Sequence, residues 1–267
     1  MTSVERVVEY INVEQENRSG QSIDNWPQKC KITYKDVNLT YGKSKDYVLK
    51  NINFTINSRE KVGIVGRTGA GKSSLISVLF RLYQYDGTIS IDDVDIRTLS
   101  LEFLRSNISI IPQDPILFSG TIRDNIDPTG RYKDHEIWKA ISTTRLKDIV
   151  PSLDYRITEG GSNFSAGQRQ LICLARAVIS KSKIIVLDEA TANVDPETDV
   201  MIYTTIQECF AECTVLMIAH RLHTVLYSDK VMVVDKGEIV EFDNPNVLLD
   251  NKNGAFYRMI EQANLLK

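Results

Sequence analysis

The residues best able to do chemistry begin with a glycine-rich run that ends in a lysine and a serine. Residues 66–73 satisfy the spacing G-x-x-x-x-G-K-[ST], with Lys72 and Ser73 at the end. Glycines let successive backbone N–H groups turn toward a phosphate chain, and a following helix presents its positive dipole end to the same charge. The run stands between an apolar stretch and a helical pattern, which is the context that this motif requires. We therefore predict a phosphate cradle in which Lys72 reaches the β- and γ-phosphates of a nucleotide and Ser73 ligates Mg²⁺.

A pair of acidic residues follows a second apolar run. Residues 184–187 are all apolar and lead directly to Asp188 and Glu189. Carboxylates at the end of a buried strand are unfavourable unless they have a partner. We expect Asp188 to hold Mg²⁺ through water and Glu189 to polarise the water that attacks the γ-phosphate. A surface turn with two solvated acids is the alternative interpretation.

Composition limits the class of protein. The chain has 267 residues, of which 42% are hydrophobic and 25% charged, as in a globular domain with a sizeable core. Its apolar runs are far shorter than the roughly 20 residues that span a bilayer, so we expect no membrane crossing and a cytosolic position. The net charge of -3 argues against nucleic acid as a partner. The four cysteines, at positions 30, 173, 209 and 213, form no CxxC pair, so we expect buried or idle thiols rather than a zinc site.

Apolar periodicity predicts an α/β fold. Strand-like runs occupy residues 32–39, 48–56, 61–65, 108–111, 183–187, 214–218 and 230–234, and helical patterns occupy residues 72–82, 165–180 and 197–209. Continuous apolar strands separated by helices indicate a sheet that is covered on both faces. The segment from about 121 to 178 is mostly helical and polar, and we expect it to form a separate lobe.

The first thirty residues are expected to be a linker. Clusters such as residues 14–22 are too polar to bury much apolar surface. Val4, Val7 and Val8 have helical spacing, which fits either the tail of an upstream element or a frayed terminal helix. We place the folded domain at residues 31–267.

The segment 163–170 identifies the family. Its Ser165-x-Gly167-Gln168 core resembles the LSGGQ signature of ABC ATPases, and it lies between the glycine-rich loop and the two acids, in the order that this family requires. The other motifs of the family also stand in order: Tyr41 in the place of the aromatic that stacks on adenine, Gln113 in a Q-loop pattern, residues 191–195 in a D-loop pattern that ends at Asp195, and His220 in the place of the switch histidine.

The resemblance covers nearly the whole chain and narrows the subfamily. Residues 61–75, the Phe164-Ser165 variant of the signature and residues 188–195 look like the second nucleotide-binding domain of multidrug resistance-associated proteins. In that subfamily the first domain often lacks the glutamate at the position of Glu189, so its presence favours a hydrolytic second domain. Phe164 replaces the usual leucine of the signature, and we expect its side chain to pack beneath the loop.

The resemblance implies a fold and a mode of action. It implies a RecA-like core of the P-loop NTPase type, an antiparallel β lobe near the N-terminus and a helical lobe that carries the signature. Two such domains would meet head to tail, with ATP between the phosphate loop of one domain and the signature of the other. The chain would be a Mg²⁺-dependent ATPase that powers export at the cytosolic face of the plasma membrane. Its partners would be the first nucleotide-binding domain and the transmembrane domains of a parent protein, and the isolated domain would be monomeric without ATP.

The resemblance assigns each site residue a role. Nucleotide binding falls to Tyr41, Gly66, Arg67, Thr68, Gly69, Ala70, Gly71, Lys72, Ser73, Ser74, Ser165, Gly167, Gln168 and Asp195. Catalysis falls to Glu189, His220 and Gln113, and the metal to Ser73, Gln113 and Asp188.

Alternatives remain for single residues and for the function. Gln113 is also readable as a surface amide, His220 as a histidine after a buried strand, and Tyr34 and Tyr47 compete with Tyr41 for the adenine. A nucleotide sensor that regulates a channel shares the subfamily's fold and motifs, and an intact Glu189 favours hydrolysis over it. A chromosome or DNA-repair ATPase is set aside because no heptad pattern separates the loop from the signature.

Overall fold

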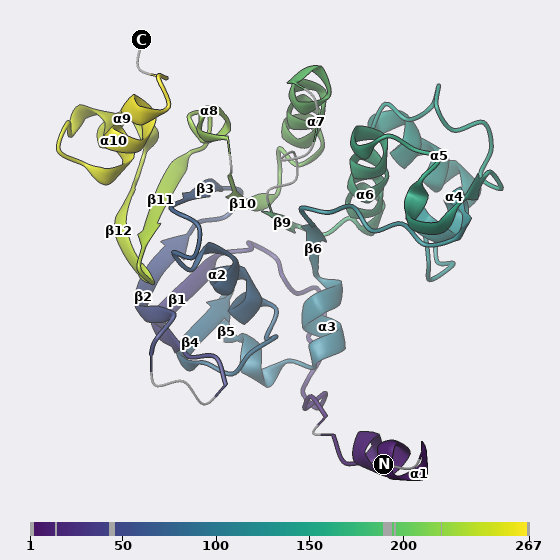
Figure 1. Cartoon of the computed structure of the whole chain (residues 1–267), viewed down its shortest axis with the longest axis horizontal. Helices are drawn as coiled ribbons and strands as arrows, with labels where there is room; N and C mark the ends of the chain where they lie inside the picture. The colour runs from purple at the N-terminus through teal and green to yellow at the C-terminus, as the bar shows by residue number, and fades with distance from the viewer. Residues whose placement is uncertain are drawn as a thin grey trace.

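A computed structural model of the chain describes residues 3–13, 15–42, 46–188, 194, 196–219 and 221–265. A mixed six-stranded sheet forms its centre (Figure 1). Its strands lie in the order β12 (Glu238–Asp243), β11 (Lys230–Asp235), β3 (Lys61–Val65), β10 (Thr214–Ile218), β9 (Ile184–Asp188) and β6 (Ile108–Ile111). All neighbours pair in parallel except β12, which runs antiparallel to β11. Ile218, at the end of β10, pairs with Ile64 on one side and Asp188 on the other, so the ends of β3, β10 and β9 meet at one edge.

Apolar side chains leave the parallel strands on both faces. Along β9, Ile184 and Val186 belong to one hydrophobic cluster, whereas Ile185 and Leu187 belong to another. Successive side chains of a strand point to opposite faces, so a run without polar residues needs cover on both. The first cluster includes α2 (Lys72–Leu79), and the second includes α6 (Ala166–Ser180) and α7 (Pro196–Cys209). The predicted two-sided cover is confirmed.

A third hydrophobic cluster closes the C-terminal end of the sheet. It packs Phe256 and Ile260 against Val231 and Val233 of β11, with both Phe256 and Ile260 almost fully buried. Three helices contribute to it: α8 (Leu222–Val225), α9 (Pro245–Asp250) and α10 (Ala255–Gln262). These helices thereby fix β11 near that edge of the sheet.

A second, antiparallel sheet lies beside α2. Its order is β2 (Leu49–Ile56), β1 (Ile32–Leu39), β4 (Asp86–Ile91) and β5 (Val94–Asp95), followed by a 3₁₀ turn (Ile96–Thr98) and α3 (Leu101–Ser106). Burial alternates along β1 except at a register shift around Asp36, where φ is 51°. The antiparallel β lobe implied by the resemblance is therefore present near the N-terminus, although β4 and β5 were not among the predicted strands.

A helical lobe stands apart from the antiparallel sheet (Figure 1). It contains α4 (Ile122–Ile126), α5 (Asp134–Thr143) and α6, a short pair of strands, β7 (Gly120–Thr121) and β8 (Arg156–Ile157), and a 3₁₀ turn (Glu159–Gly161). Its core includes Ile137, Ile141 and Leu171, each no more than 1% exposed. The lobe lies in the region of about residues 121–178, for which the sequence predicts a mostly helical segment.

The N-terminal stretch combines an exposed helix with a segment that packs on the core. In α1 (Ser3–Ile11), Val4, Val7 and Val8 are 71%, 57% and 50% exposed. The later part of the expected linker is different, because Trp26 is only 7% exposed and donates from its indole N–H to Ile91 O at 3.1 Å. The carboxylate of Asp92 also accepts the backbone N–H groups of residues 28, 29 and 31. In the described ranges, no helix is long and apolar enough to span a bilayer.

Candidate nucleotide-binding site

The glycine-rich loop joins the end of β3 to the start of α2, and two of its glycines have no substitute. Gly66 has φ of +152°, and a Cβ there would lie 2.2 Å from Val234 O. Gly71 caps α2 with φ of +110°, a backbone conformation that L side chains rarely adopt. The first N–H groups of α2 have no partner within the helix, which leaves the loop end of α2 suited to an anion.

The ammonium group of Lys72 lies over this loop. Its Nζ donates to Gly66 O at 2.9 Å and to Arg67 O at 3.2 Å. Both acceptors belong to the loop itself, so the cation is already held where a bound polyphosphate would need it. Arg67, Thr68 and Gly69 are exposed beside it.

Of the three tyrosines considered for the adenine, Tyr41 lies beside the first turn of α2. Its hydroxyl donates to Ser74 Oγ at 2.9 Å, and its ring stands edge-on to Tyr83 with centroids 4.6 Å apart. Tyr34 is only 2% exposed and donates to Leu75 O, and burial raises its pKa, so it is a core residue. Ser74 is buried, whereas Ser73 is exposed at the same turn.

The acidic residue Asp188 ends β9 at the edge where the loop begins. β10 lies between β9 and β3, and the register places Asp188 opposite Ile218, which in turn lies opposite Ile64. Asp188 is partly buried. Three further predicted site residues, Glu189, Asp195 and His220, lie outside the described residues.

Gln113 follows β6 at the same edge of the sheet. Ile111 of β6 pairs with Leu187 of β9, next to Asp188, and Gln113 is exposed two residues beyond Ile111. The amide of Gln170 on α6 donates to Pro112 O at 3.1 Å, which ties the start of this loop to the helical lobe.

The loop after Gln113 is held by a half-buried arginine on α6. Arg176 donates to Ile116 O at 2.7 Å and to Asn125 Oδ1 at 2.9 Å, and its guanidinium lies 5.9 Å from the ring centroid of Phe118. Burial lowers the pKa of Arg176. Ile116 and Phe118 are nevertheless 60% and 63% exposed, so a fixed loop presents two large apolar side chains to the outside.

The signature segment forms the capped start of α6. Ser165 Oγ accepts from the backbone N–H of Gln168 at 3.1 Å, and Gln168 Oε1 accepts from Ser165 N–H at 2.9 Å, which is a capping box. Because Ser165 Oγ accepts in this bond, the hydroxyl proton of Ser165 remains available to donate to another group. Phe164 is 5% exposed and packs against Tyr155 with ring centroids 6.0 Å apart, as expected for a residue beneath the loop.

The chain does not bring its own signature to its own phosphate loop. α6 lies in the helical lobe, and α2 lies beside the antiparallel sheet (Figure 1). Lys72, Ser73, Asp188 and Gln113 therefore share one edge of the parallel sheet, whereas Ser165 belongs to a separate surface.

Two residues near the site were not assigned a role from the sequence. Arg221 donates to Asp199 Oδ2 at 2.6 Å, and the Asp199 side chain is only 3% exposed. The two residues lie 22 positions apart. Nothing in a single sequence pairs them, although an acid in the first turn of a helix and an arginine after His220 were visible separately.

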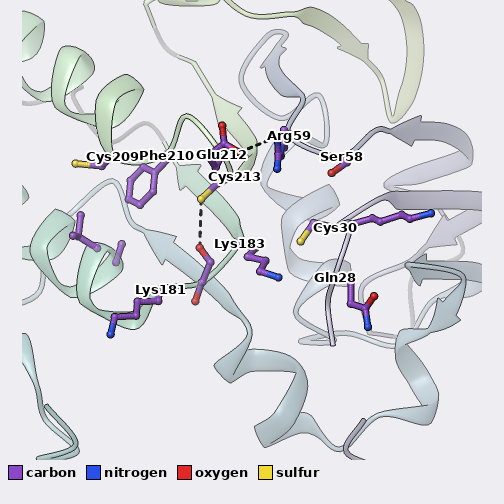
Figure 2. A pocket seen from close by; sticks show the side chains of 14 residues that line it. Gln28, Cys30, Ser58, Arg59, Lys181, Lys183, Cys209, Phe210, Glu212 and Cys213 are labelled. Atoms are coloured by element: carbon purple, nitrogen blue, oxygen red, sulfur yellow. Dashed lines mark hydrogen bonds and ion pairs between the residues drawn. The ribbon is translucent and has the colours of Figure 1, made fainter. Parts of the chain in front are cut away.

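A cavity of about 370 Å³ lies beside the N-terminal ends of β9 and β10. Asp188 stands at the other, C-terminal end of β9. Cys30, Cys209 and Cys213 line it, together with Lys181 and Lys183 (Figure 2). Burial raises the pKa of all three thiols, that of Cys30 to about 11. All four cysteines are free, and Cys30 and Cys173 are buried.

The glycine-rich strand–loop–helix and the acid-bearing strand two positions away define a P-loop nucleotide-binding domain. The profile of the family described as "ABC transporter" matches residues 49–192, which is more than half of the chain. The chain belongs to this family, in the branch of the multidrug resistance-associated proteins.

Curated relatives support this placement. The chain is 50% identical over 269 residues to ATP-binding cassette sub-family C member 4 of Mus musculus, covering 98% of this chain and 20% of the relative. It is 50% identical over 275 residues to a probable multidrug resistance-associated protein of Drosophila melanogaster, again with 98% of this chain and 20% of the relative covered. The chain therefore spans about a fifth of the length of these relatives.

A solved structure supports the fold. A bacterial Atm1-family ABC exporter with ATP bound matches with a TM-score of 0.86 and 29% identity, covering 97% of this chain and 47% of that chain. The predicted fold class, a P-loop NTPase of the ABC ATPase type, is confirmed.

Proposed function

We propose that this chain is the second nucleotide-binding domain of a multidrug resistance-associated exporter and that it hydrolyses ATP with Mg²⁺. The observation that carries the proposal is the Lys72 loop between β3 and α2, with Asp188 at the same edge of the sheet. The likeness to sub-family C member 4 over 98% of the chain supports the subfamily.

The donors at this edge fit a magnesium ion. Ser73 offers a hydroxyl, Asp188 a carboxylate and Gln113 an amide oxygen, and Mg²⁺ prefers such oxygen ligands. When bound, Mg²⁺ would neutralise charge on the phosphate oxygens. The roles of the individual site residues belong to the same proposal, as does a folded domain over residues 31–267 with the packed segment around Trp26 as its N-terminal extension.

The chain's own residues would prepare the nucleotide for attack. Lys72 would exchange its two carbonyl acceptors for phosphate oxygens, and Tyr41 would offer its ring to the adenine. Glu189 would orient the attacking water and accept its proton. His220 and Gln113 would contact the γ-phosphate end of the nucleotide. These two contacts would form only when the bound nucleotide carries a γ-phosphate.

The separate position of Ser165 supports a shared site. The start of α6 has unsatisfied N–H groups and an exposed serine hydroxyl, which suit a γ-phosphate bound by another domain. We infer a head-to-tail pair of domains with ATP between the Lys72 loop of one and the Ser165 turn of the other. The partner in the parent protein would be its first nucleotide-binding domain.

The exposed loop after Gln113 supports a contact with transmembrane domains. Ile116 and Phe118 are large, apolar and more than half exposed on a loop that Arg176 holds in place. Apolar side chains fixed in this way mark an interaction surface. We infer that this loop meets the transmembrane part of the parent at the cytosolic face of the plasma membrane.

Phosphate release from Mg²⁺-ATP, measured over a wide range of chain concentrations, tests this function. We expect weak turnover whose specific rate rises with concentration, because each site needs a second domain. Omission of Mg²⁺ should abolish it. Lys72→Ala should abolish it too, by removing the cation along the phosphates. A specific rate that stays constant at high dilution would contradict the shared site.

A further inference from the structure

A buried carboxylate in the first turn of α7 depends on one arginine. The Asp199 side chain is 3% exposed, and its Oδ2 accepts from Arg221 Nη1 at 2.6 Å. Among the described residues, its other oxygen, Oδ1, has no hydrogen-bond partner, and His223 Nε2 lies 3.8 Å from Oδ2. A buried charge is strongly unfavourable without its partner, so the position of Arg221 matters to this turn.

The second arm of the same guanidinium holds another segment. Arg221 Nη2 donates to Val194 O at 2.9 Å. Arg221 is the residue just before α8 and follows His220 in the sequence, and Val194 immediately precedes Asp195. One planar group therefore connects the start of α8, the first turn of α7 and Val194. Two fixed donors in one plane are a property of arginine that lysine lacks.

The first turn of α7 also touches the start of the signature helix. α7 lies between α8 and α6 (Figure 1). A Cβ built on Gly167 of α6 would lie 2.5 Å from Thr198 Cγ2 and 3.4 Å from Val194 Cγ1. Val194 is thus in contact with both Arg221 and Gly167, and Thr198 immediately precedes Asp199, so Gly167, two residues after Ser165, packs on the segments that Arg221 contacts.

We propose that Asp199 and Arg221 are positioning residues that join the turn before α8 to the start of α6. On the proposed function, which this inference deepens, His220 serves the nucleotide held by this chain, and Ser165 serves the nucleotide held by the partner. The Asp199–Arg221 pair then couples the two nucleotide sites through a single chain. Such coupling requires that both segments move as one unit.

Hydrogen exchange tests the coupling without any need for hydrolysis. Asp199→Asn keeps the size of the side chain and removes its charge, and Arg221→Lys keeps the charge and removes the two-armed contact. In either variant, amide exchange should rise together in residues 165–168 and 221–226. Arg59→Ala is the matched control, because Arg59 and Glu212 form an exposed pair, 66% and 74% exposed, away from this cluster. Exchange that rises only beside the substituted residue, or no more than in Arg59→Ala, overturns the proposal.

Phosphate release shows the consequence for turnover. At a concentration where the unsubstituted chain turns over, both variants should lose about 3- to 30-fold in rate, with the affinity for a fluorescent ATP analogue changed less than about twofold. A circular-dichroism melt confirms that each variant is folded, and Arg221→Lys carries the test if Asp199→Asn is not. Unchanged turnover in a folded variant contradicts the proposal. Failure of the unsubstituted chain to bind ATP contradicts the proposed function instead, and hydrogen exchange still decides the coupling.

Discussion

At the scale of single residues, the sequence alone does not decide which tyrosine would contact the adenine. Three tyrosines competed for the adenine, and the structure separates them by burial and position. Tyr34 is in the core, Tyr47 is 49% exposed, and Tyr41 is hydrogen-bonded to the helix that follows the phosphate loop. The hydroxyl bond to Ser74 positions the ring, but stacking on a base needs only the ring itself.

Substitution of Tyr41 should therefore separate the ring from the hydroxyl. Tyr41→Phe should bind a fluorescent ATP analogue within about threefold of the unsubstituted chain, since the ring that would stack on the base is kept and only the hydrogen bond that positions it is lost. Tyr41→Ala should bind it at least about fivefold more weakly, because base stacking contributes about 1–3 kcal/mol.

Two controls sharpen this measurement. Tripolyphosphate, which has no base, should compete equally well in all three proteins. Tyr47→Ala should leave the affinity for ATP unchanged. Equal ATP affinity in Tyr41→Ala and the unsubstituted chain would remove Tyr41 from the adenine site.

At the scale of the elements, the strands that can be predicted from the sequence are the ones that are buried on both faces. Residues 61–65, 108–111 and 214–218 are strands with the predicted bounds, because uninterrupted apolar runs signal strands buried on both faces. The sequence does not predict β12, since each of its residues is exposed or half-buried and three of them are acids. α2 ends at Leu79, three residues before the predicted end at residue 82. Arg81, just beyond it, has φ of 52°, a left-handed conformation that cannot continue a right-handed α-helix.

The candidate site was predictable only where the motif is local. The phosphate loop needs eight consecutive residues and was found whole, and its strand and helix stand where the motif requires them. The pair of Asp199 and Arg221 was invisible, because the two side chains meet only after β10 and α7 have packed. Contacts between distant positions leave no pattern in one sequence.

The packing of α6 on α7 gives a prediction at this scale. Gly167→Ala places a methyl group 2.5 Å from Thr198 Cγ2, where neither helix start has room. We expect it to destabilise the chain by about 1–3 kcal/mol, as overpacking does. Urea unfolding measures this change. Thr198→Ser removes the opposing methyl group, so the double variant should regain most of the loss. A double variant as unstable as Gly167→Ala would mean that another contact limits this position.

At the scale of the whole molecule, the proposed function assigns two separate surfaces of the chain to different nucleotides. One edge of the parallel sheet carries Lys72, Ser73 and Asp188, and the helical lobe carries Ser165. On this proposal, neither surface is a complete site for hydrolysis by itself. We therefore propose that ATP joins two domains and that Glu189 ends this association by hydrolysis.

Glu189→Gln is the substitution that tests this claim most directly. Glutamine keeps the size of the side chain and its ability to hold a water molecule, but it cannot accept the proton of the attacking water. Loss of one negative charge near the γ-phosphate should also stabilise the ATP-bound pair. Asp188→Asn should differ, because loss of a metal ligand weakens Mg²⁺-ATP binding itself.

Light scattering with Mg²⁺-ATP, together with phosphate release from the same samples, is the decisive measurement. For Glu189→Gln we expect a nucleotide-loaded dimer with phosphate release reduced to background, whereas the unsubstituted chain should stay mainly monomeric and turn over slowly. If Glu189→Gln remains monomeric and releases phosphate at the unsubstituted rate, Glu189 is not the catalytic base, and a nucleotide-sensing role becomes the better account of this domain.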